Sequence, residues 1–153
     1  MRFTIRRGCF ETNSSSVHSI QVMNTVRQKS KLKVFSDGKV HVPCGEFGKE
    51  HCVYTDQITK LSYLVTQLAY STKAYYDGDL EELYQDYEFE LLDKYIREYC
   101  GCNGIKVIKL NKADIDHQSM PESGYVEFIN LYDKDKVLDF IFCEDFALVT
   151  DCD

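Results

Sequence analysis

The amino-acid sequence predicts an α+β protein: a single domain over residues 1–153, in which a small, mostly antiparallel sheet packs against a central helix pair. Three observations predict this class. Strand-like alternation of apolar residues opens the chain, helical periodicity fills its middle, and both patterns return near its end. Segregation of this kind favours α+β over a doubly wound fold. A chain of 153 residues is also long enough to bury a hydrophobic core.

The first third of the sequence predicts short strands. Residues 17–22 alternate between polar and apolar side chains, as a half-buried strand does. Residues 32–42 are typical of a β-hairpin, because Asp37-Gly38 between two apolar runs favours a type I′ turn. Pro43 is expected to end the second strand of this hairpin.

The middle third predicts two helices. Thr55 is a suitable N-cap for a helix over residues 56–74, whose apolar residues recur at three- and four-residue steps. A second helix is expected over residues 79–99, with Gly101 as its terminator. The buried side of the second helix is predicted to hold Leu80, Leu83, Tyr84, Tyr87, Leu91, Tyr95 and Ile96.

The last third predicts a mixture of both element types. Residues 105–110 are expected to form a strand, residues 135–142 a short helix and residues 146–150 a closing strand. Residues 125–131 fit either a strand or a helix. We find no internal repeat and no linker composition, which is why one domain is expected.

Charge is distributed unevenly over a chain whose net charge is −7. Residues 1–34 contain seven lysines and arginines against a single acid, Glu11, and residues 77–98 contain nine acids against two basic residues. A cationic end suits a phosphate or carboxylate ligand, and an acidic helix suits either solvent or a basic protein surface. Seven cysteines match neither a disulfide framework nor a standard zinc spacing, so reduced thiols are expected.

Three polar clusters lie where strands or helices are expected to end: Glu11–His18, Glu46–His51 and Asp116–Ser119. Binding and catalytic residues concentrate on such loops. A pair of histidines can serve as acid and base in the cleavage of a phosphodiester, while arginines stabilise the developing charge. The predicted catalytic residues are His18, His117 and Asp116. The predicted ligand-binding residues are Arg6, Arg7, Glu11, Asn13, Ser14, Ser15, Ser16, Glu46, Gln118 and Ser119.

Other chemistries remain open at these clusters. Glu46, Asp116 and His117, with Glu50 or His51, offer oxygen and nitrogen ligands for a divalent metal, but no paired spacing such as H-E-x-x-H is present and no cofactor is expected. Nucleophilic catalysis is less favoured, because no G-x-S-x-G elbow is present. Binding without catalysis would need only backbone N–H groups and hydroxyls arranged as a nest.

The run from Arg7 to Ile20, R-G-C-F-E-T-N-S-S-S-V-H-S-I, resembles the opening of small proteins of bacteriophages and of bacteria of the Firmicutes type. Two further stretches are similar to the same family: C-G-E-F-G at residues 44–48, followed by K-L-S-Y-L at residues 60–64, and I-D-H-Q-S at residues 115–119. The resemblance covers most of the chain. It implies a phage origin and no particular reaction.

These observations together lead to one functional hypothesis and two alternatives. By analogy with other small acidic phage proteins, the protein is expected to be an anti-CRISPR-like inhibitor of host defence whose polar site binds or cleaves RNA or a nucleotide, as a metal-independent ribonuclease or phosphodiesterase would. The alternatives are a non-enzymatic inhibitor that docks through the acidic helix 79–99, and a metal-dependent hydrolase. The expected partner is a host defence protein, or its guide RNA or nucleotide signal, in the host cytoplasm. No membrane segment is expected, since no apolar run approaches the ~20 residues of a span.

Overall fold

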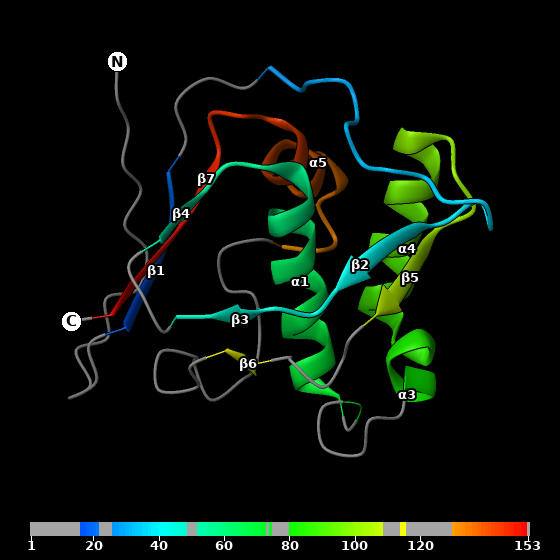
Figure 1. The fold of residues 1–153 in the computed structure, drawn as a ribbon, viewed down its shortest axis with the longest axis horizontal. Helices are drawn as coiled ribbons and strands as arrows, with labels where there is room; N and C mark the ends of the chain where they lie inside the picture. Colours follow the sequence, from blue (N-terminus) through cyan, green and yellow to red (C-terminus); the bar gives the residue numbers. More distant parts are fainter. Residues whose placement is uncertain are drawn as a thin grey trace.

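The computed structural model describes residues 16–21, 26–48, 52–72, 74, 80–108, 114–115 and 130–152. Helices and strands are mixed within these ranges, which confirms the predicted α+β class (Figure 1). The helices are α1 (Gln57–Ser71), α3 (Leu80–Gln85), α4 (Tyr87–Cys100) and α5 (Lys134–Phe142). The strands are β1 (Ser16–Gln21), β2 (Val40–Pro43), β3 (Glu46–Phe47), β4 (Cys52–Tyr54), β5 (Ile105–Ile108), β6 (Asp114–Ile115) and β7 (Ala147–Cys152).

The strands form three small sheets within the described residues, and their pairing differs from the mostly antiparallel sheet that was predicted. One sheet, in the order β1-β7-β4, is antiparallel. The other two, β2–β5 and β3–β6, are parallel pairs. Parallel pairing is possible here because α1, α3 and α4 lie between the paired strands in the sequence and provide the long crossover that parallel strands need.

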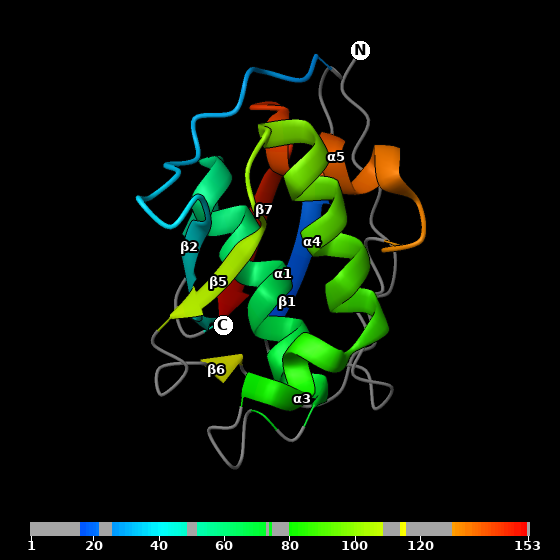
Figure 2. The same ribbon diagram turned by 90° about the vertical axis from the view of Figure 1, so that its right-hand side faces the viewer.

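Helix α1 lies at the centre of the fold and packs against α5, β2, β6, α3 and α4 (Figures 1 and 2). Most of its residues are buried on all sides of the helix, so it has no broad solvent face. Its N-cap is Asp56, whose carboxylate accepts the backbone N–H of Thr59 at 2.8 Å. The predicted N-cap, Thr55, lies one residue too early, because the aspartate is the side chain that reaches the first turn.

The helix predicted over residues 79–99 is two helices in the structure, because the chain breaks at Asp86. The Asp86 carboxylate accepts two backbone N–H groups from the first turn of α4, at 2.9 and 3.0 Å, and so acts as the N-cap of that helix. The break alters which residues face the core. Phe89 is buried, whereas Tyr84 and Tyr87 are 41% and 59% exposed, so their predicted burial was wrong.

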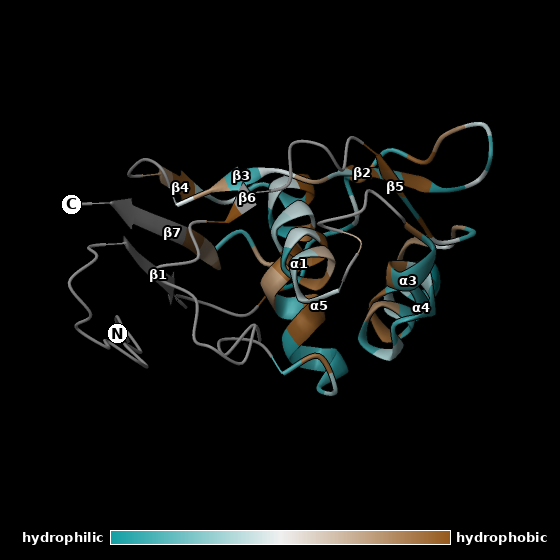
Figure 3. Cartoon of the chain, turned by 90° about the horizontal axis from the view of Figure 1, so that it is seen from below, coloured by the Kyte–Doolittle hydropathy of each residue, from teal (hydrophilic) through white to brown (hydrophobic). Residues whose placement is uncertain are grey.

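Other parts of the prediction are confirmed. Leu83, Tyr95 and Ile96 are buried on the core side of α3 and α4, and both helices carry hydrophilic and hydrophobic residues, as Figure 3 shows. Gly101 ends α4 in the left-handed conformation, with φ of 64°. The predicted strands over 17–22, 105–110 and 146–150 correspond to β1, β5 and β7, and the predicted helix over 135–142 corresponds to α5.

The turn of the predicted hairpin is not of type I′. Phe35 N donates to Lys39 O at 2.9 Å, and Gly38 N donates to Phe35 O at 2.9 Å. These bonds enclose a three-residue loop that places Gly38 in the left-handed region, with φ of 75°. Among the described residues, antiparallel pairing beyond the turn is limited to a bridge between Val34 and Val40, since β2 forms its ladder with β5.

Side chains from α3 and α4 close the free edge of β5. Ile105 N donates to Asp93 Oδ1 at 2.6 Å, and Val107 N donates to the Tyr84 hydroxyl at 2.9 Å. An edge strand with free N–H groups is a template for pairing with other chains. The two side chains therefore satisfy donors that β2 does not use, and they explain why Tyr84 stays at the surface.

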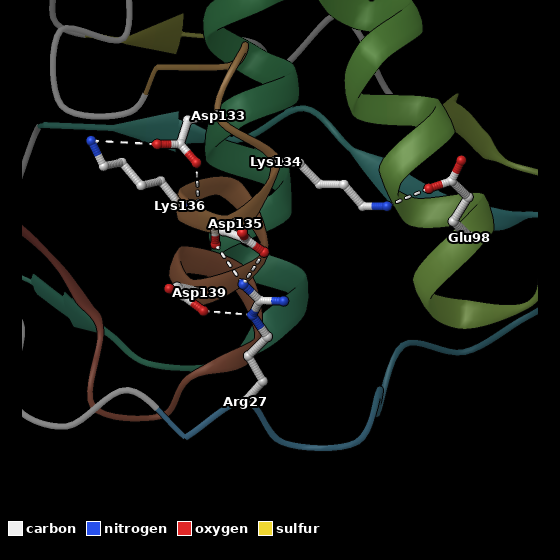
Figure 4. A network of polar contacts seen from close by, with 7 residues as sticks. All are labelled: Arg27, Glu98, Asp133, Lys134, Asp135, Lys136 and Asp139. Atoms are coloured by element: carbon white, nitrogen blue, oxygen red, sulfur yellow. Dashed lines mark hydrogen bonds and ion pairs between the residues drawn. The ribbon is translucent and has the colours of Figure 1, made fainter.

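Ion pairs attach the segment before β2 to α5 and attach α5 to α4 (Figure 4). Arg27 donates from Nε to Asp139 at 2.5 Å and from Nη2 to Asp135 at 2.7 Å. Lys134 pairs with Glu98 of α4 at 2.5 Å. Each such pair contributes no more than about 1 kcal/mol where it is exposed. Their effect is to fix the position of one segment against another.

Candidate functional site

Strand β1 carries the end of the N-terminal polar cluster into the three-stranded sheet. Ser16 and His18 are its first and third residues, and His18 lies opposite Thr150 of β7. Cys52, the first residue of β4, lies opposite the same Thr150 on the other side. Because neighbouring strands are about 4.8 Å apart, the backbones of His18 and Cys52 are about 10 Å apart. Strands β1 and β4 thus begin at the same end of the sheet, where β7 ends.

Strands β3 and β6 bring the second and third polar clusters together. Glu46 lies opposite Asp114, and Phe47 lies opposite Ile115, in a parallel pair. Parallel strands leave a sheet at the same end. Ile115, after which the sequence enters the cluster Asp116–Ser119, therefore lies beside the strand end from which the chain continues to Gly48.

The two strand systems are linked by a short connection. Gly48 and Cys52 are four residues apart, which limits the separation of their Cα atoms to about 14 Å. The end of the β3–β6 pair is therefore close to the end of the three-stranded sheet at which β1 and β4 begin, as Figure 1 also shows. The backbone brings the described ends of all three polar clusters into one region.

Most of the predicted site residues lie outside the part of the chain that the structure describes. The side chains of Ser16 and His18 are likewise not described, although their backbones are. Glu46 is described, and its side chain is exposed on β3. The predicted residues outside the described ranges are Arg6, Arg7, Glu11, Asn13, Ser14, Ser15, Asp116, His117, Gln118 and Ser119.

The motif C-G-E-F-G at residues 44–48, which overlaps the start of the second cluster, is a packing unit of the fold. Gly45 N donates to Thr66 Oγ1 at 3.0 Å, and Ser62 Oγ donates to Pro43 O at 2.5 Å. A Cβ atom on Gly45 would lie 2.7 Å from the ring of Phe47. Two hydroxyls of α1 and one glycine thus hold the bend between β2 and β3, which leaves Glu46 as the residue of this motif that faces solvent.

Burial raises the pKa of three of the described cysteine thiols above its usual value. Five are described, and all are free: Cys44, Cys52, Cys100, Cys102 and Cys143. Burial raises the pKa of Cys44 to about 11, and burial also raises the pKa of Cys100 and of Cys143. The described residues hold no group of three histidine, cysteine or acidic side chains that could bind a metal ion. The predicted metal ligands other than Glu46 lie outside those residues.

The acidic helices have less free charge than the sequence suggests, because several acids are used within the fold. Asp86 caps α4, Asp93 pairs with Arg97 at 2.9 Å and also accepts Ile105 N, and Glu98 pairs with Lys134. The exposed acids of α3 and α4 are Glu81, Glu82, Glu90 and Glu98. Of the seven acids of this stretch that the structure describes, four are therefore exposed and form an acidic surface.

The structure also contains a cleft that the sequence did not reveal. It has a volume of about 770 Å³ and lies at the N-terminal end of α1. Its walls come from residues 31–33, Phe35, His41, residues 55–58 and residues 144–145. These segments are far apart in sequence and share no motif. The sequence signal that could have indicated this cleft was the alternation of Lys29, Lys31 and Lys33.

Comparison of the chain with protein-family models, with curated proteins and with solved structures gave no match. The resemblance of its motifs to phage proteins therefore stays a prediction. Within the described residues, no helix combines the length and the apolar character that a membrane span requires.

Proposed function

We propose that the protein binds a phosphate-containing ligand, RNA or a nucleotide, where the three polar clusters meet at one end of the β1-β7-β4 sheet. We propose further that it does so in the counter-defence of a bacteriophage. The observation that supports this proposal most is the strand register. His18 and Cys52 lie opposite Thr150 on either side, and Phe47 lies opposite Ile115, so the described ends of the segments 11–18, 46–51 and 116–119 lie in one region.

The residue types of these clusters suit phosphate chemistry. Arg6 and Arg7 would neutralise a phosphate, and Asn13 with the neighbouring serines would donate hydrogen bonds to it. His18 and His117 would serve as base and acid if the ligand is cleaved, because an imidazole titrates near neutral pH. Asp116 and Gln118 are suited to orienting an imidazole or a ribose.

Binding and cleavage of a labelled single-stranded RNA test the proposal separately. The double variant Arg6→Gln, Arg7→Gln should weaken binding, measured by fluorescence anisotropy, and should flatten its salt dependence. His117→Ala should retain binding and lose cleavage, measured on a gel with and without a chelator. Cleavage that stops with the chelator would identify the metal-dependent alternative, and absence of any RNA or nucleotide binding would refute the proposal.

The alternative of docking through the acidic helices is distinguished by charge reversal. The triple variant Glu81→Lys, Glu82→Lys, Glu90→Lys changes exposed positions and should leave RNA binding intact. Asp86 is excluded from this variant because its loss would remove the cap of α4. In a cell-based interference assay, loss of protection with the triple variant and not with His117→Ala would support the docking alternative.

A further inference from the structure

The cleft at the N-terminal end of α1 has the size and chemistry of a binding site. A volume of about 770 Å³ lies within the range that ligand pockets in proteins usually have. Leu32 and Ile58 contribute apolar surface, and Phe35, 38% exposed, contributes an aromatic ring. The Phe35 ring is supported by the ring of His41, which stacks on it at 4.0 Å between centroids with an angle of 6°.

One wall of the cleft is acidic. Asp56, Glu144 and Asp145 line it, and Lys31 Nζ already pairs with Glu144 at 2.7 Å. Asp56 and Asp145 make no ion pair with any described residue. Among the described residues, the Asp145 carboxylate has no cationic partner, and the Asp56 carboxylate, which caps α1 through Oδ1, has none either.

The aromatic wall also receives a cation. Lys33 Nζ lies 4.8 Å from the centroid of the Phe35 ring, in the geometry of a cation–π contact. Lys31 and Lys33 are both exposed, so each can leave its position at small cost. The protein's own ammonium groups thus occupy two positions, one carboxylate and one ring face, that suit the basic groups of a ligand.

We infer that the cleft binds an arginine- or lysine-bearing peptide segment of a partner protein. A guanidinium would stack on the Phe35–His41 pair in place of Lys33, since arginine stacks on aromatic faces. A second basic group would pair with Asp145 or Asp56. The net charge of −7 would attract a basic partner from solution. The inference does not depend on the phosphate site.

Fluorescence anisotropy with a labelled peptide that carries two arginines in a neutral sequence tests this inference, with citrulline in place of each arginine as the ligand control. Salt near physiological strength suppresses long-range attraction. Asp145→Asn should weaken binding roughly two- to fivefold, as loss of an exposed ion pair does. Lys33→Ala should strengthen binding by roughly the same factor, because it frees the ring face.

Two control variants remove the same charges elsewhere. Glu90→Gln and Lys94→Ala change exposed residues of α4 and should leave the dissociation constant within a factor of two. Lys33, Glu90 and Lys94 are exposed and Asp145 is half-buried, and thermal melts verify that each variant folds. The inference would be overturned if the cleft variants and the control variants had equal effects, or if no saturable binding were observed. A crystal structure in which a nucleotide, and not the peptide, occupies the cleft would also overturn it.

Discussion

Lys60 on α1 is fully buried, and this position should make the stability of the protein depend on pH. Its Nζ donates to the backbone oxygens of Cys143 and Phe146 at 2.8 and 3.0 Å, and Cys143 is the C-cap of α5. The ammonium group therefore satisfies one carbonyl at the negative end of that helix and one in the turn that follows it. Desolvation by burial lowers the pKa of Lys60 from 10.5 to about 8.

The sign of the effect follows from proton binding. The folded protein releases the Lys60 proton near pH 8, whereas the unfolded chain keeps it until about pH 10.5. Between these values the unfolded state binds more protons, so the free energy of unfolding increases with pH. From pH 7 to pH 9.5 a shift of this size corresponds to an increase of about 2 kcal/mol at most, because the two carbonyls favour the charged form.

Lys60→Met removes this titration, and urea unfolding followed by far-UV circular dichroism under reducing conditions measures the result. Lys60→Met should be less stable than the wild type at pH 9.5 by more than it is at pH 7, since only the wild type gains from deprotonation. Lys94→Met on the exposed side of α4 is the matched control and should follow the wild type. Parallel pH profiles for the wild type and Lys60→Met would refute this account.

Three further substitutions test the fold. Gly45→Ala should cost about 1–3 kcal/mol of unfolding free energy, because its Cβ would lie 2.7 Å from the Phe47 ring; wild-type stability in a urea titration would contradict the proposed packing. Asp86→Ala should cost about 1 kcal/mol, with faster amide hydrogen exchange at the start of α4, whereas Asp86→Asn should preserve the cap. Tyr84→Phe should cost about 1–2 kcal/mol because Val107 N loses its acceptor, and an unchanged denaturation midpoint would show that the edge of β5 does not need it.

The elements that could be predicted from the sequence are those whose signals are local. Strands β1 and β7 and helix α5 follow from alternation and periodicity, and Gly101 marks the end of α4. The break at Asp86 was missed because apolar periodicity continues across it, although an aspartate three residues before the apolar Phe89 is also a cap signal. The parallel pairs were missed because strand pairing over long sequence separations depends on tertiary packing.

The burial of α1 on all sides was also beyond the sequence pattern. Its apolar stripe predicts one buried face, but Lys60 and Gln67 are buried as well, since α1 is surrounded by other elements. The cleft is made by three segments with no shared motif, so no local signal combines them. The three polar clusters, in contrast, were recognised from composition, and the strand register supplies the reason that their ends are close.

The measurement that tests the central claim most directly is the separation of the His18 and His117 imidazoles in a crystal structure of the protein with a bound nucleotide. If the three polar clusters form one site, both rings should face the phosphate and lie within about 8 Å of each other, the room that one phosphate needs between acid and base. Imidazoles on opposite sides of the core, with the nucleotide elsewhere, would contradict the proposed site.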